Sequence, residues 1–442
     1  MTHMLFRLSR VAALVLGIGM MAYMIEKRYY ERMVAEAIML FVFLGVSILY
    51  EKKRKLFSTG YIFLFIVFFI IFNLFLCYFI KENLVLLQYK KVGERVPSDQ
   101  FFLYFIVYIS CMCIIAVLLS LKRKTILPVK REFTYESDIA VWLMGILFCL
   151  PVTIYGGVSM ALLYAPIICY VFLRLKIRKY HISLFLFCMV TGSAIVILHF
   201  VIYRYIMVEY FLPIILAYLF IESYTEKSKP KKIICLLVLG IVAVGLYGVV
   251  SEIVKLNYFF NKQYDIQLIL QNTAALSHYI ENQIYRLFGI WSILGGNIIE
   301  YVQENGYFYG ITFIKAAAPI FGFPYISLPL ISASMVGASY AQPGLLAEGY
   351  ANFGIIGSIL NLLFPYLIAE GCLDYFLKKK NLFSICLLTV PFSKVLLDGG
   401  SINSIIIGII MCFICFFIAG VCHNLKVRLI SNIRVRRILK WN

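Results

Sequence analysis

The sequence predicts an all-α polytopic integral membrane protein with about twelve transmembrane helices, on the strength of its composition, its apolar runs and its basic clusters. Of the 442 residues, 62% are hydrophobic and only 14% are charged, and the mean hydropathy is +0.90. One soluble core cannot bury so much apolar surface. Apolar runs long enough to cross the hydrocarbon core, about 17 to 25 residues as a helix, recur along nearly the whole sequence. The runs are continuously apolar rather than alternating, which favours helices over a barrel.

The basic residues lie in short clusters between the apolar runs. The formal net charge is +19, but clusters such as "KKRK" at 52 and "KSKPKK" at 227 are typical of cytoplasmic anchors, so no nucleic-acid partner is predicted. All 12 cysteines lie within or at the edges of apolar segments. A cysteine in such a place is a small apolar side chain, and neither redox chemistry nor zinc binding is expected of it.

Twelve spans fit the apolar runs, and the first begins close to the N-terminus. The N-terminal 24 residues have a basic start and an apolar middle, as in a signal peptide, but they contain no clear small-residue cleavage site. We therefore interpret them as a span. The twelve predicted spans are centred near residues 15, 42, 70, 111, 147, 165, 191, 214, 241, 357, 390 and 412.

Lys and Arg are unequally distributed between the two sides of the membrane. With the N-terminus in the cytoplasm, the inner segments hold 28 of them and the outer segments hold 12, with Lys394 inside a span. Cytoplasmic loops are enriched in Lys and Arg, so both termini are predicted to be cytoplasmic. The organisation is then nine transmembrane helices in 1–250, one large extracytoplasmic segment in 251–344, and three transmembrane helices with a basic cytoplasmic tail in 345–442.

The large outer segment, which precedes the tenth span, is too long for a simple connection, and loops of this size are usually functional or folded. The stretch "YDIQLILQNTAALSHYIENQIYRLFGIWSILG" has the spacing of a helix, and "ITFIKAAAPIFGFPYISLP" is then interrupted by prolines and glycines. We expect short helices that lie on the membrane surface or dip into it.

Two isolated arginines on the outer side are candidate phosphate contacts. Arg204, in "LHFVIYRYIMVEYFLP", lies at the predicted turn between two apolar runs. Its guanidinium could bind a phosphate through two hydrogen bonds. Equally, Arg204 could be a structural residue whose side chain reaches the membrane interface and pairs with Glu209. Arg286, in "ENQIYRLFGIW", lies on an amphipathic outer helix one turn from Asn282. Arg286 could bind a phosphate, or it could simply be a solvated charge on the surface of that helix.

Lys315 and His278 complete the candidates from the outer segment. Lys315 has apolar residues on both sides and is a candidate second phosphate contact. His278 can carry a proton near neutral pH, although a solvated histidine on a surface helix explains it as well. The sequence contains no Walker loop, HExxH or DxD motif, so neither a metal nor another cofactor is predicted.

The stretch "YAQPGLLAEGYANFGIIGSIL" carries a carboxylate and an amide into a predicted span. Pro343 and Gly344 mark the outer start of the helix, so Glu348 lies about one turn inside it and Asn352 one turn deeper. Burying both side chains costs free energy unless they take part in a functional site or form hydrogen bonds with other groups. They either form part of an outward-facing site or brace a neighbouring helix. A stripe of small residues that would let such a helix approach closely consists of Ala347, Ala351, Gly354 and Ser358.

At "AEGYANFGIIG", together with "YGITFIKAAAPIFGFP" before it and "YRYIMVEYFLP" further back, the chain resembles the Wzy-type polymerases of oligosaccharide repeat units in bacterial surface-glycan pathways. In that family a large outer segment precedes a late span that begins with an acidic residue and continues to Asn-Phe-Gly. Pro319 matches the proline after the "YG" segment, but the basic residue that often follows is absent from "PIFGFP". The residues that match the late motif are Glu348, Gly349, Tyr350, Asn352, Phe353 and Gly354.

The resemblance implies an integral-membrane glycosyltransferase on the outer face of the bacterial plasma membrane. It would transfer a growing glycan from undecaprenyl diphosphate to the non-reducing-end hydroxyl of another lipid-linked unit, with no metal and no other cofactor. Arg204 and Arg286 would stabilise the diphosphate leaving group. Glu348, the best-placed carboxylate, would accept the hydroxyl proton, with His278 as the substitute. The substrate-binding candidates are Lys315, Asn352, Tyr350 and Gly349.

The resemblance also implies the lipid bilayer as surroundings, and a chain-length regulator and a flippase as candidate partners. Two other functions fit the sequence. A ligase would move finished glycan from the same lipid carrier to another acceptor. A flippase or transporter of lipid-linked oligosaccharide would place charged residues through the middles of many spans, whereas here they gather at the outer ends.

Overall fold

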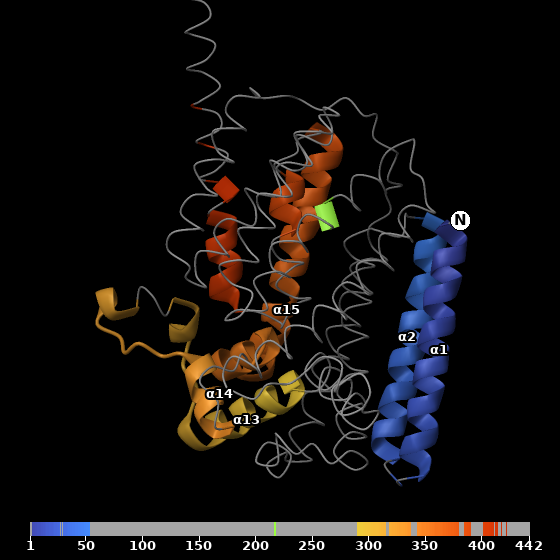
Figure 1. The fold of residues 1–442 in the computed structure, drawn as a ribbon, viewed down its shortest axis with the longest axis horizontal. Coiled ribbons are helices and arrows are strands. Elements are labelled where there is room, and N and C mark those ends of the chain that lie inside the picture. The colour runs from blue at the N-terminus through green and yellow to red at the C-terminus, as the bar shows by residue number, and fades with distance from the viewer. Residues whose placement is uncertain are drawn as a thin grey trace, which may run out of the picture. The chain divides into compact units, whose positions relative to one another are not determined.

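The structure is a computed structural model of residues 1–442, and the part of the chain that it describes is helical, with no strand among the described residues (Figure 1). The all-α prediction is confirmed for this part. The described residues are 2–26, 28, 30–53, 216–217, 290–314, 318–336, 343–379, 384–389, 401–410, 412–413, 417 and 421. The chain divides into two compact units, of which one holds 1–128, 222–370 and 394–405 and the other holds 129–221, 371–393 and 406–442.

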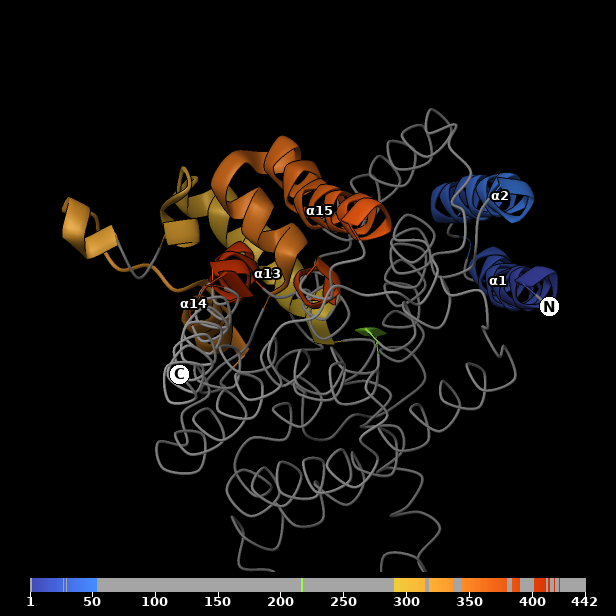
Figure 2. The same ribbon diagram turned by 90° about the horizontal axis from the view of Figure 1, so that it is seen from above.

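Helices α1 (Thr2–Glu26) and α2 (Tyr30–Lys53) form an antiparallel hairpin, which both ribbon views show (Figures 1 and 2). Arg28 closes the turn with a positive φ of 61° and donates its backbone N–H to the Ile25 carbonyl at 3.1 Å. The buried residues of each helix recur at spacings of four, three and four, which places them on one face. They are Ala13, Gly17, Met20 and Met24 on α1, and Glu36, Leu40, Phe43 and Ser47 on α2.

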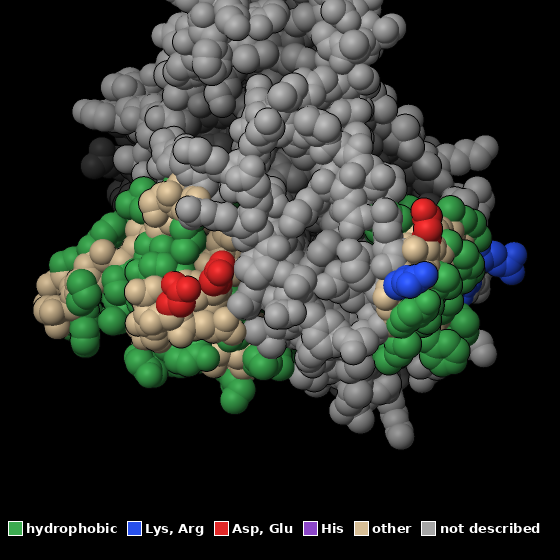
Figure 3. Space-filling view, turned by 90° about the horizontal axis from the view of Figure 1, so that it is seen from below, with side chains coloured by type: hydrophobic (Ala, Val, Ile, Leu, Met, Phe, Trp, Pro, Cys, Tyr) green, Lys and Arg blue, Asp and Glu red, His purple; other side chains and the backbone are tan. Residues whose placement is uncertain are grey.

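The outer face of this hairpin is apolar and exposed. Val15 is 66% exposed, Ile18 55% and Phe41 81%. On the face that Figure 3 shows, apolar side chains cover much of the described surface, with few charged side chains among them. A soluble helix would carry its polar residues on such a face, so this pattern suits a helix surrounded by lipid.

Helix α13 (Ile290–Asn305) leads into a loop at 306–310, the 3₁₀ turns η1 (Ile311–Ile314) and η2 (Ala318–Phe321), and helix α14 (Leu328–Val336), which packs against α13. The sequence predicted short helices broken by prolines and glycines here, and these elements confirm that description. The exposed aromatic residues of the second half are Phe321, Phe323 and Tyr325.

Helix α15 (Leu345–Lys379) is broken near its start. Phe353 (φ −143°, ψ 23°) and Gly354 (φ 64°, ψ −149°) leave the helical region, so a first part at 345–352 and a second part at 355–379 meet at a sharp bend. The bend folds the first part back onto the second. Ser358 donates its hydroxyl to the Leu346 carbonyl at 2.9 Å, and Asn361 donates its side-chain amide to the Leu345 carbonyl at 3.0 Å.

This break corrects the sequence prediction of an uninterrupted helix with a stripe of small residues against a neighbouring helix. Gly354 lies in the bend, and Ser358 contacts the first part of its own helix. Gly349 and Gly357 approach so closely that a Cβ on either would meet the backbone of the other. The small residues permit close approach as predicted, but the helix packs on itself.

Two described helices are long and apolar enough to cross a membrane, at Ser9–Glu26 and Leu345–Phe376. They coincide with the predicted spans near 15 and 357. The described residues of the spans near 42, 214, 390 and 412 are also helical. The other predicted spans, and the whole of the outer segment from 251 to 289, lie outside the described residues.

Candidate functional site

Asn352, at the end of the first part of α15, joins that helix to the loop after α13. Its Oδ1 accepts the backbone N–H of Gly310 at 2.7 Å. Its Nδ2 donates to the Thr312 hydroxyl at 2.6 Å and to the Glu348 carbonyl at 2.7 Å. The side chain is fully buried. Three short hydrogen bonds satisfy an amide that would otherwise be costly to bury, so Asn352 holds the 306–312 segment on the helix.

The same segment packs over the bend in α15. Phe308 donates its backbone N–H to the Ala351 carbonyl at 2.9 Å, which gives a carbonyl near the broken helix end a partner. The Phe353 ring lies over Gly310 and 6.1 Å from the Phe313 ring. The Tyr307 hydroxyl lies against Gly354. The stretches "YFYGIT" and "YANFG", about forty residues apart in the sequence, therefore form one packed unit, which we call the 307–354 junction.

Aromatic side chains line one side of the junction. The Tyr307 ring lies 6.1 Å from that of Tyr350 and 6.3 Å from that of Tyr309. Gln303 donates its side-chain amide to the Tyr350 hydroxyl at 3.4 Å. Desolvation raises the pKa of Tyr307 above its usual value, and the neighbouring Tyr350 raises it further through charge repulsion and a side-chain hydrogen bond. Tyr309 is 74% exposed, so part of this aromatic group faces outward.

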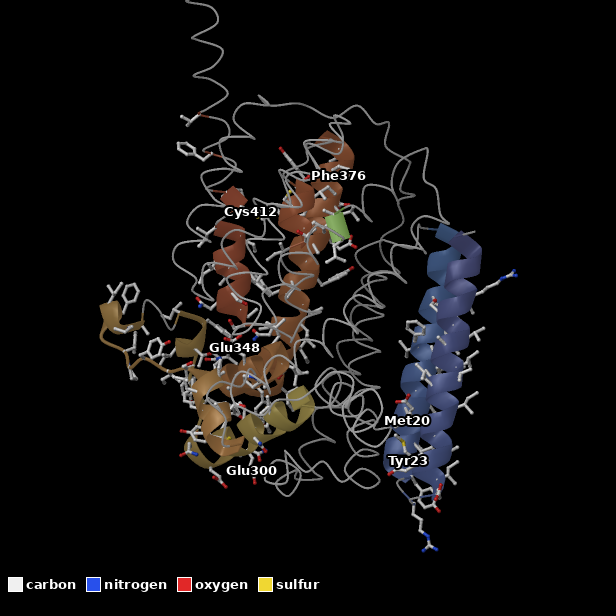
Figure 4. All side chains as sticks on the ribbon, in the orientation of Figure 1. Met20, Tyr23, Glu300, Glu348, Phe376 and Cys412 are labelled. Atoms are coloured by element: carbon white, nitrogen blue, oxygen red, sulfur yellow. The ribbon has the colours of Figure 1, made fainter. Side chains whose placement is uncertain are left out.

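Glu348 lies one turn before Asn352 and reaches a different element (Figure 4). Its Oε2 accepts the backbone N–H of Ile402 at 2.7 Å, at the start of the helix at 402–410, and the side chain is only 4% exposed. Ser401 and Ser404 cap the same helix end reciprocally, with N–H to hydroxyl distances of 3.1 and 3.2 Å. A carboxylate at a helix N-terminus is favoured by the helix dipole, so Glu348 stabilises this helix.

Replacing Glu348 tests its contact with the 402–410 helix. Glu348→Ala leaves a buried N–H without this acceptor, and we expect the free energy of unfolding to fall by about 1–3 kcal/mol. Glu348→Gln keeps an oxygen for Ile402 and loses only the charge, so it should cost about 0.3–1 kcal/mol. Thermal unfolding of the purified protein in detergent measures both. If both variants unfolded at the wild-type midpoint, the contact would contribute nothing to stability.

The structure brings four of the eight predicted site residues together and describes none of the other four. Glu348, Gly349, Tyr350 and Asn352 all lie on the first part of α15, where Gly349 packs against Gly357 and Tyr350 joins the aromatic group. The candidates that lie outside the described residues are Arg204, His278, Arg286 and Lys315.

Several residues in or near the junction, and two at the start of the 402–410 helix, were not predicted from the sequence. Thr312 and Gln303 gave no signal, because a single Thr or Gln in a loop or helix has many uses. The pair Ser401 and Ser404 did give one, since Ser-x-x-Ser before an apolar run resembles a capping box.

Two further buried polar atoms on the packed helices α13 and α14 lack hydrogen-bond partners among the described residues, Asn297 Nδ2 and Ser332 Oγ. Within the described part there is no cluster of three metal-ligating side chains.

In the part of the chain that the structure describes, the protein is helical and has two membrane-length helices, and the later of them is broken and bound to the segment before it. More particularly, the chain belongs to a family of unknown function, DUF6032, which matches residues 1–442. No curated protein and no solved structure matches the chain. Any functional assignment therefore rests on the residues of this chain.

Proposed function

We propose that this protein polymerises lipid-linked oligosaccharide repeat units on the outer face of the bacterial plasma membrane. In this proposal the chain crosses the membrane about twelve times with both termini in the cytoplasm. The 251–344 segment and the outer ends of the spans form the site. The substrates are two polyprenyl-diphosphate-linked oligosaccharides, one as donor and one as acceptor.

The observation that carries this proposal is the 307–354 junction. Two of the three stretches that carry the resemblance to repeat-unit polymerases, "YGITFIKAAAPIFGFP" and "AEGYANFGIIG", are separate in the sequence. Asn352 binds Gly310 and Thr312 at 2.7 and 2.6 Å, so residues of the two motifs are in direct contact at the start of a membrane-length helix. Exposed aromatic rings such as Tyr309, 74% exposed, are suited to contact sugar faces there.

The reaction needs a stabilised leaving group and a proton acceptor. The acceptor hydroxyl oxygen forms a bond to the anomeric carbon of the donor glycan, while the bond from that carbon to the diphosphate oxygen breaks and the diphosphate takes the electron pair. Arg204 and Arg286 are proposed to bind the diphosphate, where fixed cations stabilise the charge that develops. Lys315 is proposed as a further phosphate contact.

The hydroxyl proton passes to a base, for which Glu348 and His278 are the two candidates. One oxygen of Glu348 already accepts the Ile402 N–H, and the side chain is nearly buried. We therefore assign Glu348 to positioning the 402–410 helix and His278 to accepting the proton, since its ordinary range of protonation suits that task.

Gel analysis of surface and lipid-linked glycan tests the proposal in cells that lack this gene. We expect single repeat units to accumulate, and wild-type protein to restore a ladder of longer chains. Arg204→Ala should leave the single units, because the leaving group loses its cation. Arg28→Ala is the matched control, since Arg28 is an exposed arginine at the turn between α1 and α2. Immunoblots of the membrane fraction establish equal protein levels.

Other glycan patterns would contradict the polymerase. Long lipid-linked polymer in the deletion strain would indicate a ligase. Repeat units retained on the cytoplasmic side would indicate a flippase. An unchanged ladder in Arg204→Ala at normal protein level would remove Arg204 from the site.

A further inference from the structure

Glu36 is a buried carboxyl group on the inner face of the α1–α2 hairpin. It is 0% exposed, and neither Oε1 nor Oε2 has a hydrogen-bond partner among the described residues. It lies on the same helix face as the apolar residues Leu40 and Phe43, so it occupies a position where an apolar side chain would be expected. Figure 4 shows Met20 and Tyr23 on the part of the hairpin that lies near the turn.

The buried face of α1 that packs against α2 carries no charged side chain among the described residues. Its buried residues are Ala13, Gly17, Met20 and Met24, none of which is ionisable. Tyr23 is the titratable residue of α1 that is adjacent in sequence to this face, and it makes no hydrogen bond to either Glu36 oxygen. The charged side chains of α1 with described positions lie toward its ends, at Arg7, Arg10 and Glu26.

An ionised carboxylate with no partner in such a place is costly. Removing a carboxylate from water without a counter-ion or hydrogen bonds costs several kcal/mol even after relaxation. A neutral carboxylic acid avoids most of this cost. Ser47, the other polar residue of the α2 face, shows the usual solution, since its hydroxyl donates to the Leu44 carbonyl at 2.9 Å. Glu36 has no such partner in the described residues.

We propose that Glu36 is a proton-binding site, a neutral carboxylic acid enclosed within the α1–α2 hairpin. A proton held there exchanges with water only when the hairpin opens or water enters it, so protonation and the packing of α1 on α2 are linked. This inference is independent of the glycan chemistry. In membrane proteins, an enclosed ionisable residue of this kind is by default a functional site rather than a packing residue.

An apolar carbodiimide detects such an acid. The protonated carboxyl adds across a carbon–nitrogen double bond of the reagent: the acid proton moves to a nitrogen, the carboxyl oxygen bonds to the central carbon, and no group leaves. The product rearranges to a stable acylurea. The full-length protein in detergent is treated with dicyclohexylcarbodiimide at about pH 8, where an ordinary glutamate is ionised, and peptides are analysed by mass spectrometry.

We expect an adduct on Glu36 in the wild type and loss of that adduct in Glu36→Gln. Glu26, an exposed glutamate at the end of α1, is the matched control. It should give no adduct with the apolar reagent at about pH 8, and it should react with a water-soluble carbodiimide at about pH 5, where part of an ordinary glutamate population is protonated. Glu36→Gln should unfold at the same temperature as the wild type, because an amide resembles the neutral acid.

Two results would overturn the proposal, and both can be read without a folded variant. If wild-type Glu36 gives no adduct with the apolar reagent at this pH, it is ionised and paired with a basic group. If it reacts as readily as Glu26 with the water-soluble reagent, it is in contact with water. Failure of Glu36→Gln to fold would support the first of these, because a paired carboxylate cannot be replaced by an amide without loss.

Discussion

Asn352→Ala should destabilise the protein by about 3 kcal/mol and abolish the ladder of long glycan chains, because it removes all three hydrogen bonds of a fully buried side chain at once. The Gly310 N–H, the Thr312 hydroxyl and the Glu348 carbonyl all lose a partner. The 306–312 segment would then detach from the end of the first part of α15. Thermal unfolding of purified protein gives the stability, and gels of cellular glycan give the chain length.

The matched control for Asn352→Ala is Asn305→Ala. Asn305 also donates its side-chain amide to a backbone carbonyl, that of Tyr301 at 2.8 Å, but this bond is exposed and lies within one helix. Its loss should change the free energy of unfolding by less than about 0.5 kcal/mol. Equal effects of the two substitutions would mean that the junction contributes no more than an ordinary surface contact.

Gly349→Ala should be among the most damaging single-methyl additions at the glycines that the structure describes. The new Cβ would lie against the Gly357 carbonyl and the Ser358 backbone, which cannot rotate away as a side chain can. The two parts of α15 must then separate, at a cost of about 3 kcal/mol or more. We expect a large fall in the thermal midpoint and poor recovery of folded protein by size-exclusion chromatography.

Gly371→Ala, in the same helix, should have the opposite effect on stability. Gly371 is exposed, and no atom lies within 4 Å of the position that its Cβ would take. Alanine there should stabilise the helix by about 0.5–1 kcal/mol. If Gly349→Ala proved as harmless as Gly371→Ala, the close contact with Gly357 would be wrong.

The sequence predicted the start of α15 but not its break. Pro343 and Gly344 mark the start, and the helix begins at Leu345 as expected. Gly354 offered no comparable signal, because a glycine inside an apolar run costs only about 1 kcal/mol in a helix. The bend is stabilised by Tyr307, Phe308 and Gly310. Such contacts between distant segments cannot be derived from local spacing.

The roles of Glu348 and Asn352 also depend on partners that are distant in the sequence. The sequence showed that Glu348 and Asn352 needed to be used or satisfied, and left open whether they form a site or brace the fold. Bracing is what the described contacts provide, since Asn352 holds the preceding segment and Glu348 caps a helix that begins 54 residues later at Ile402. The sequence did not predict the burial of Glu36, because the position of a single carboxyl in a span does not show which face of the helix it occupies.

The most direct test of the polymerase proposal is chain growth by the purified protein in lipid vesicles supplied only with polyprenyl-diphosphate-linked repeat units. The account predicts glycans longer than one unit together with release of polyprenyl diphosphate, with no nucleotide sugar added and with a metal chelator present. Repeat units that stay at their original length, whether or not they cross the bilayer, would contradict it.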